Sequence, residues 1–463
     1  MITTDGTPTY RSVNPTTGEI QAEFAGINDS ELTDAIERGE SAYQSWRSTS
    51  VEVRARIVRR VGVLFAERAE ELAAIATSEM GKPRIEAKGE AEFCGEIFDF
   101  YADRGPALIE GEPLEAANAE AVIQRRPIGL LLGIMPWNYP FYQVARFVAP
   151  NLMLGNTMLL KHANSVPLSA LAIARLMTDA GVPEGVYQNV FASREQIATI
   201  IADPRVQGVS LTGSERAGSA VGETAGKHLK KCVLELGGSD PYIVLDTDDV
   251  DVSARKAWRT RLANTGQACN SNKRLIVMDG IYDSFVERLT ELAINIAPGD
   301  PANWTDGRYA PLSSRAAAEG LRAQVEDAVD KGATLHAGGT LGPEPTAYFA
   351  PAVLTGVVPG MRAYDEELFG PVAVVYRVHD DDEAVRLAND SVYGLGGAVF
   401  STQVERAQKV AERLEVGMAN VNTPGGEGAN IPFGGVKRSG FGRELGVLGM
   451  DEFANKRLFY IKN

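Results

Sequence analysis

The spacing of apolar residues predicts a largely helical region at the start of the chain. Ser30-Glu31-Leu32 is typical of a helix start, and apolar residues recur every three or four positions from Val51 to Gly81. The helical pattern continues to about Arg104. The alternating stretch 121–126 then predicts an arm of two strands, ahead of an apolar run that ends at Met135.

Strand-like and helix-like segments alternate in the next part of the chain. Apolar stretches predict strands at 158–160, 186–191, 206–211 and 232–236, and the segments between them predict helices at 167–180, 193–202 and 214–225. Such a β-α-β-α-β series implies a parallel sheet with helices on both faces. Ligands of these sheets bind beyond the carboxyl ends of the strands. Lys161, Gly213 and Glu235 all fall at predicted strand ends, so we expect them to face one crevice.

A second α/β region is predicted from about Gly238 to Lys437. Its expected helices lie at 252–263, 282–296, 315–331, 382–388 and 404–414, with apolar strands such as 372–375 between them. The chain ends in the apolar segment 458–461. An apolar final segment on a soluble protein requires a partner surface.

Composition narrows the class of protein. With 463 residues, 44% hydrophobic and 23% charged, the chain should form two or three ordinary globular domains. A net charge of −15 argues against nucleic acid as a partner. The three cysteines and four histidines lack ligand spacing, so we expect neither disulfides nor a metal. Residues 1–6 lack a signal-peptide pattern and no apolar run is long enough for a membrane span, which predicts a cytoplasmic protein with reduced thiols.

The most informative chemistry lies in two short stretches. Cys269 follows the turn Thr265-Gly266-Gln267-Ala268 and precedes Lys273 and Arg274, whose charges would favour a nucleophilic thiolate. Glu235 ends an apolar run before two glycines, where partial burial would raise its pKa and allow it to act as a base. Taken alone, the cysteine would more often be a buried apolar residue and the glutamate a surface carboxylate.

Seven motifs that follow one another along the chain favour the catalytic interpretation of Cys269 and Glu235. They are Met135-Pro136-Trp137-Asn138-Tyr139-Pro140, Leu160-Lys161-His162-Ala163, Leu211-Thr212-Gly213-Ser214, Glu235-Leu236-Gly237-Gly238, Gly266-Gln267-Ala268-Cys269, Glu366-Glu367-Leu368-Phe369-Gly370-Pro371 and Pro432-Phe433-Gly434-Gly435. Together they resemble the NAD(P)-dependent aldehyde dehydrogenase superfamily along essentially the whole chain, and most closely its bacterial succinate-semialdehyde dehydrogenase branch. The resemblance implies an α/β fold with two doubly wound domains and a small β arm for oligomerisation.

The resemblance also implies catalytic roles. Cys269 would attack an aldehyde, Asn138 would bind the resulting oxyanion together with the cysteine N–H, and Glu235 would activate the water that hydrolyses a thioester. The expected reaction is oxidation of the aldehyde to the acid. A CoA-acylating relative is the main alternative, although that branch generally lacks the glutamate base.

A nucleotide site follows from the same comparison, although the G-x-G-x-x-G fingerprint is missing. The turn Gly213-Ser214 before a helix would present amides to a pyrophosphate. The residues implied at the cofactor are Trp137, Lys161, Asn164, Gly213, Ser214, Leu236, Glu367 and Phe369. Asn164 stands where NAD-preferring members often have a glutamate, so we expect NADP, with NAD as the alternative.

The substrate is less clear from the sequence. Arg146 matches an arginine that semialdehyde-oxidising relatives use to bind a distal carboxylate, which makes succinate semialdehyde the leading candidate; a salt bridge to a neighbouring helix is the other reading of this arginine. Two positions depart from relatives. Phe147 replaces a lysine of many superfamily members, and Glu427 stands about where close relatives have a serine that helps to bind the carboxylate.

The resemblance implies a domain plan and an assembly. We expect a nucleotide-binding domain at 1–113 and 131–237, a catalytic domain at 238–438, and an arm at 114–130 and 439–463. A small aldehyde is the expected partner molecule, with no membrane and with assembly into a homodimer or homotetramer.

Overall fold

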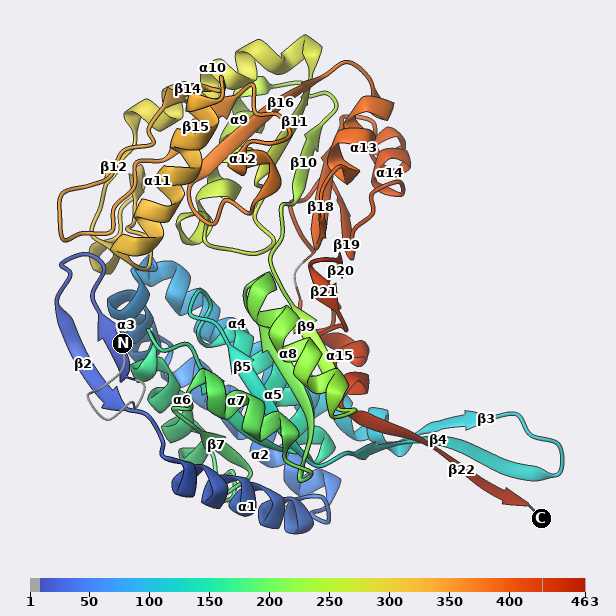
Figure 1. Cartoon of the computed structure of the whole chain (residues 1–463). Helices are drawn as coiled ribbons and strands as arrows, with labels where there is room; N and C mark the ends of the chain where they lie inside the picture. The colour runs from blue at the N-terminus through green and yellow to red at the C-terminus, as the bar shows by residue number, and fades with distance from the viewer. Residues whose placement is uncertain (1–8, 427, 463) are drawn as a thin grey trace.

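The computed structural model describes residues 9–426 and 428–462, which form two α/β units and a projecting β arm (Figure 1). The chain begins with an antiparallel hairpin of β1 (Thr9–Val13) and β2 (Ile20–Ala25). Four helices follow: α1 (Asp29–Trp46), α2 (Val51–Glu67), α3 (Ala69–Met80) and α4 (Arg84–Glu110). Asn28 and Glu31 form a capping box at α1, which is why this helix begins where the sequence predicts.

The predicted end of the helical region near Arg104 is wrong. Helix α4 continues through Pro106 to Glu110. Gly105 packs against α5 (Tyr142–Leu154), where an added Cβ would lie 2.3 Å from Cγ of Met153. This close packing outweighs the hydrogen bond that a proline removes from a helix.

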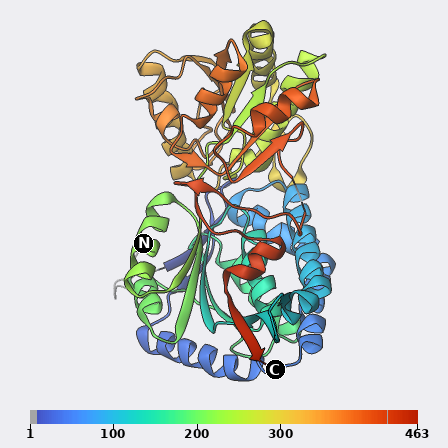
Figure 2. The same ribbon diagram turned by 90° about the vertical axis from the view of Figure 1, so that its right-hand side faces the viewer.

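The first sheet has the strand order β21-β9-β8-β5-β6-β7. Its strands are β5 (Leu130–Met135), β6 (Thr157–His162), β7 (Tyr187–Asn189), β8 (Val206–Thr212), β9 (Lys231–Glu235) and the antiparallel β21 (Gly440–Phe441). The helices that follow α5 are α6 (Pro167–Asp179), α7 (Arg194–Ala202) and α8 (Glu215–Lys227). Leu130 and Leu132 pack in one core with α1, α7 and α8, whereas Leu131 packs in another with α2 to α6. Figure 2 shows helices on both sides of this sheet, as predicted.

The second sheet has the order β14-β15-β16-β11-β10-β18-β19 and is parallel except for β14. Its strands are β10 (Pro241–Val244), β11 (Arg274–Met278), β14 (Thr334–Ala337), β15 (Ala352–Thr355), β16 (Val372–Val378), β18 (Gly396–Phe400) and β19 (Met418–Val421). Its helices are α9 (Val250–Leu262), α10 (Asp279–Asn295), α11 (Arg315–Asp330), α12 (Arg362–Asp365), α13 (Asp381–Asn389) and α14 (Val404–Ala411). The same part of the chain contains short elements outside this sheet: η1 (Ala263–Gly266), β12 (Ala297–Pro298), η2 (Pro301–Asn303), β13 (Arg308–Tyr309), β17 (Tyr393–Gly394) and β20 (Val436–Lys437). Strand β12 pairs with β13, and β17 pairs with β20.

The arm is a three-stranded antiparallel sheet that extends from the body of the molecule (Figure 1). Its order is β22-β4-β3, from β3 (Glu112–Leu114), β4 (Ala119–Pro127) and β22 (Ala454–Lys462), which follows α15 (Gly446–Glu452). The apolar side chains of 458–461 are 44% to 57% exposed on β22. No helix among the described residues is long and apolar enough to cross a membrane. The α/β fold with two sheets and a small β arm confirms the predicted class.

Candidate active site

Cys269 lies between two cavities that the fold brings together. The first, of about 300 Å³, is lined by Tyr142, Arg146 and Phe433, among others. The second, of about 270 Å³, has Ser214 and Glu367 in its wall. Cys269 lines both cavities, so a molecule in either one can reach its sulfur.

A tight turn holds the cysteine in place. Asn264 and Thr265 both have positive φ angles, of 48° and 53°, which non-glycine residues adopt only when their surroundings fix them. The Asn264 side chain donates a hydrogen bond of 2.9 Å to the Asn138 carbonyl. An added Cβ on Gly266 would lie 2.5 Å from the Gly370 carbonyl oxygen, so this turn also requires a glycine.

The surroundings of Cys269 act on its thiol in opposite directions. Burial raises the pKa of Cys269 to about 12, while the nearby cations Arg146 and Lys273 lower it. Lys273 thus favours the charged form, as expected from the sequence. The expectation for Arg274 is wrong, because its guanidinium points to the carbonyls of Leu387 and Ala388.

Asn138 lies beside the cysteine in the second cavity. Its side chain is 4% exposed, and its Nδ2 donates a hydrogen bond of 3.0 Å to the Gln267 carbonyl. A side-chain amide carries two N–H groups, so one donor remains for a ligand.

Glu235 ends β9 but does not line either cavity. Its carboxyl group is buried beside Gly434, where an added Cβ would lie 2.6 Å from Oε1. Neither carboxyl oxygen has a hydrogen-bond partner among the described residues. Burial, and then the nearby Glu444, raise the pKa of Glu235 well above its ordinary value. This shift has the expected direction, although the burial behind it is nearly complete rather than partial.

The second cavity gathers most of the residues predicted at the nucleotide. Gly213 follows β8, and Ser214 caps α8 by accepting a hydrogen bond of 3.4 Å from the Ala217 N–H. Trp137 and Phe369 stack edge to face, with ring centroids 5.7 Å apart. The cavity is lined by Trp137, Asn138, Gly213, Ser214, Leu236, Glu367 and Phe369, together with Cys269.

Glu367 faces this cavity from the segment after α12. Its Oε1 accepts a hydrogen bond of 3.1 Å from the Gly238 N–H and forms an ion pair of 3.0 Å with Lys273 Nζ. An added Cβ on Gly237 would come within 2.5 Å of Glu367 Oε2, so the absence of a side chain there leaves space for the carboxylate.

Lys161 and Asn164 lie together at the end of β6, outside the lining of both cavities. Lys161 Nζ donates a hydrogen bond of 2.7 Å to Asn164 Oδ1. Burial, with a smaller effect of Arg194, lowers the pKa of Lys161 to about 8.

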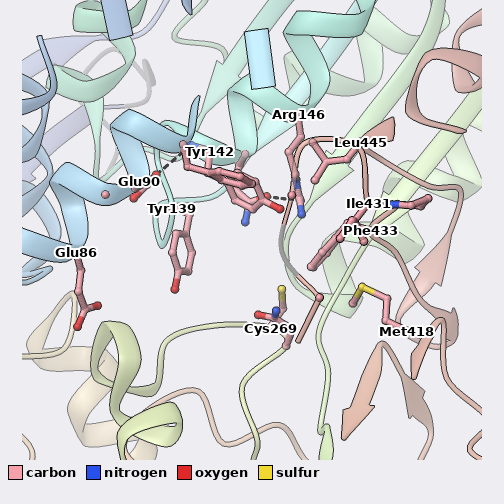
Figure 3. A pocket seen from close by; sticks show the side chains of 17 residues that line it. Glu86, Glu90, Tyr139, Tyr142, Arg146, Cys269, Met418, Ile431, Phe433 and Leu445 are labelled. Atoms are coloured by element: carbon pink, nitrogen blue, oxygen red, sulfur yellow. Dashed lines mark hydrogen bonds between the residues drawn. The ribbon is translucent and has the colours of Figure 1, made fainter. Parts of the chain in front are cut away.

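Arg146 projects from α5 into the first cavity, on the side opposite Cys269 (Figure 3). It is 1% exposed, and its guanidinium lies 4.7 Å from the ring centre of Tyr142 and 4.4 Å from that of Phe433. Its Nε forms an ion pair of 2.7 Å with Glu444 Oε2. Its Nη1 has no hydrogen-bond partner among the described residues. Arg146 therefore forms a salt bridge, as one interpretation of the sequence expected. It also keeps a free donor group, which the other interpretation, binding of a substrate carboxylate, requires.

Known proteins match this arrangement along the whole chain. The aldehyde dehydrogenase family model matches residues 2–458. The chain belongs to the aldehyde dehydrogenase family. A Deinococcus radiodurans relative named succinate-semialdehyde dehydrogenase (NADP+) is 55% identical over 97% of this chain and 94% of its own length. An Escherichia coli relative named succinate semialdehyde dehydrogenase (NAD(P)+) Sad is 41% identical, over 96% of each chain.

Solved structures agree. The crystal structure of succinic semialdehyde dehydrogenase from Streptococcus pyogenes, in complex with NADP+, has a TM-score of 0.95 and 40% identity, and the match covers 98% of this chain and all of that one. The predicted family and the prediction of an NAD(P)-dependent enzyme that oxidises aldehydes are therefore confirmed.

Sequence reasoning missed several residues of this aldehyde dehydrogenase site. Tyr142 and Phe433, which enclose the Arg146 guanidinium, and Glu444, which pairs with it, were not predicted. An arginine in an apolar helix signals that a partner exists, but not which residue it is. Glu427 lies outside the described residues, although its neighbours Gly426 and Gly428 line the first cavity.

Proposed function

We propose that this enzyme oxidises succinate semialdehyde to succinate with NADP+. The observation that carries the proposal is the position of Arg146, whose unpartnered Nη1 is buried in the cavity that ends at Cys269. A cation there would bind the carboxylate at the far end of a short semialdehyde, and it would hold the aldehyde carbon near the sulfur. The names of the relatives in Deinococcus radiodurans and Escherichia coli support this substrate.

The first step is addition of the Cys269 thiol to the aldehyde. The sulfur forms a bond to the carbonyl carbon, the π electrons move to oxygen, and the thiol proton is transferred to that oxygen, giving a thiohemiacetal. Burial raises the pKa of the thiol to about 12, so its deprotonation depends on Arg146 and Lys273, whose positive charges lower this pKa. The free N–H of Asn138 stabilises the negative charge that develops on oxygen.

The second cavity fits a nicotinamide dinucleotide. Ser214 and the following amides at the start of α8 suit a pyrophosphate, and Glu367 suits ribose hydroxyl groups. Lys161 without a neighbouring carboxylate suits the 2′-phosphate of NADP, with Asn164 in the position that would otherwise repel it. When bound, a nicotinamide would supply the oxidant: it would take the hydride from the thiohemiacetal carbon while the hydroxyl proton leaves to solvent, so that a thioester would remain on Cys269.

Hydrolysis of the thioester requires a base. Glu235 can serve if its carboxyl group turns from Gly434 towards Cys269, because the move into a wetter cavity removes part of the desolvation that raises its pKa. It would then take a proton from the attacking water. The acid leaves, and the proton returns the cysteine to its thiol form.

We also propose that the arm mediates assembly into a homodimer or homotetramer, and that the enzyme acts in the cytoplasm. β22 is an edge strand with exposed apolar side chains, including Phe459 and Ile461, which a second copy would cover. We further propose the domain limits expected from the sequence: a nucleotide-binding domain at 1–113 and 131–237, a catalytic domain at 238–438, and the arm at 114–130 and 439–463. Light scattering of the wild type and of Phe459→Asp tests the assembly, since a buried aspartate should shift the mass towards the monomer.

The function is tested with a panel of aldehydes and both nucleotides, measured as formation of reduced nucleotide. We expect the highest kcat/KM for succinate semialdehyde with NADP+. A preference for butanal over succinate semialdehyde would refute the substrate. Product formation only when CoA is present would instead identify an acylating enzyme.

A further inference from the structure

Lys273 lies behind the second cavity and contacts two of its lining residues, Cys269 and Glu367, and the reaction steps above give it no role in positioning them. Lys273 directly precedes β11 in the chain and is 1% exposed. Its ammonium group donates to the carbonyls of Ala268, at 2.7 Å, and Cys269, at 2.8 Å. It also forms an ion pair of 3.0 Å with Glu367. The ammonium group therefore contacts the backbone of the nucleophile through two hydrogen bonds and the nucleotide side through one ion pair.

We propose that Lys273 is a positioning residue that holds the backbone at Cys269 and the carboxylate of Glu367 in a fixed relation. The inference rests on the proposed nucleotide-binding role of Glu367. A mobile Glu367 carboxylate would bind ribose hydroxyls less well, because part of the binding free energy would go into ordering it. A mobile Cys269 backbone would misplace the sulfur relative to the bound nucleotide.

The charged groups near Cys269 also support a connection between Cys269 and Glu367 through Lys273. Lys273 lowers the pKa of Cys269, whereas Glu367 raises it. Arg146 also lowers this pKa and Asp240 raises it, so these four groups are among the charged surroundings of the thiol. Removing Lys273 and removing the charge of Glu367 should therefore change thiol reactivity in opposite directions. A residue that only supports the fold would not give opposite signs.

The test compares Lys273→Met, Glu367→Gln and the double variant. The first readout is the Kd for NADPH, measured by fluorescence titration. Loss of one charged contact should weaken binding by about tenfold in each single variant. If Lys273 acts through Glu367, the double variant should bind within about twofold of Glu367→Gln alone, because the two effects are not additive.

The second readout is alkylation of Cys269 by iodoacetamide in the nucleotide-free enzyme, located by mass spectrometry. Lys273→Met should be slower and Glu367→Gln faster than wild type, each by about threefold or more, because below the pKa each unit changes the thiolate fraction tenfold. Lys82→Met is the matched control. Lys82 is also 1% exposed and ion-paired, but its partners Glu90 and Tyr139 do not line the second cavity, so its variant should keep the wild-type Kd for NADPH.

The outcomes separate the two proposals. If Glu367→Gln weakens NADPH binding but Lys273→Met does not, the role of Lys273 is refuted and that of Glu367 stands. If Glu367→Gln binds NADPH like wild type, the nucleotide assignment fails, and the link through Lys273 fails with it. Alkylation that slows equally in both variants would also refute the link. If Lys273→Met does not fold, Lys273→Gln removes the charge and the ion pair with Glu367 while keeping a polar side chain, and it should change both readouts in the same directions, by smaller factors.

Discussion

The ion pair between Arg146 and Glu444 decides how the substrate proposal has to be tested. Replacing Arg146 alone would remove the group proposed to bind substrate, but it would also leave a buried carboxyl without its partner. The two side chains are 0% and 6% exposed, and breaking such a pair from one side typically costs about 3 to 5 kcal/mol of stability. The double variant Arg146→Leu with Glu444→Gln removes both charges and avoids this cost.

The size of the expected effect follows from the contact that is lost. A charge-assisted hydrogen bond to a substrate carboxylate contributes about 2 to 3 kcal/mol, or roughly 30- to 150-fold in kcat/KM. The double variant should lose this factor with succinate semialdehyde. With butanal, which has no carboxylate, we expect a change below about threefold. Steady-state kinetics with both aldehydes measure the two ratios.

Equal losses with both aldehydes would refute the reasoning, because Arg146 would then support the site without contacting the carboxylate. Glu444→Gln alone is the control. It keeps the guanidinium, so its preference for succinate semialdehyde over butanal should stay within about threefold of wild type.

The single variant Arg146→Leu carries a pH signature of its own. Burial raises the pKa of Glu444 and Arg146 lowers it, so the pKa rises further when the arginine is removed. A carboxyl with a raised pKa in the folded state favours folding at low pH, and this contribution is lost as the pH rises from the unfolded value, about 4.3, through the folded value. Arg146→Leu should therefore lose thermal stability relative to the double variant as the pH rises. A constant difference between the two would show that Glu444 does not titrate in this range.

Three further predictions address the other proposed roles. Cys269→Ala should keep the Kd for NADPH within about twofold and lose all but about 1% of oxidation, and turnover of more than a few per cent would exclude the cysteine as nucleophile. Glu235→Gln should give a burst of NADPH followed by slow turnover in rapid mixing, since hydrolysis needs the base more than the first step does; equal losses in both phases would assign Glu235 to activation of Cys269 or to structure. Asn164→Glu should shift kcat/KM towards NAD+, through repulsion of the 2′-phosphate next to Lys161, and an unchanged ratio would show that Asn164 does not face the ribose.

Local sequence patterns predicted most of the fold. Helices α6, α7 and α8 and strands β6, β8 and β9 begin and end close to the predicted residues, because capping residues and short apolar runs define each of them locally. The error at Pro106 has a nonlocal cause. There, packing of Gly105 against Met153 lets the helix continue past a residue that ordinarily ends one.

In the candidate site as well, short motifs predicted some features, whereas others depend on contacts between residues far apart in sequence. The seven motifs implied that Cys269, Asn138, Ser214 and Glu367 would belong to one site, and they line one cavity. The expectation that Lys161, Gly213 and Glu235 face one crevice is wrong, because of these three only Gly213 lines either cavity. The contacts that set the charge of the site join residues far apart in sequence, such as Arg146 with Glu444 and Lys273 with Glu367. A single sequence holds no local signal for such pairs.

These pairs also change what the catalytic residues can do. From the sequence, Cys269 is a cysteine beside basic residues, and a thiolate is the natural expectation. In the structure, burial outweighs the neighbouring cations, so the thiol is favoured until charge develops in the reaction. Glu235 lines neither of the cavities that meet at the cysteine, and both its oxygens are unpartnered among the described residues. Burial thus raises the pKa of both the nucleophile and the base, and Arg146 and Lys273 are the groups that favour the thiolate of Cys269.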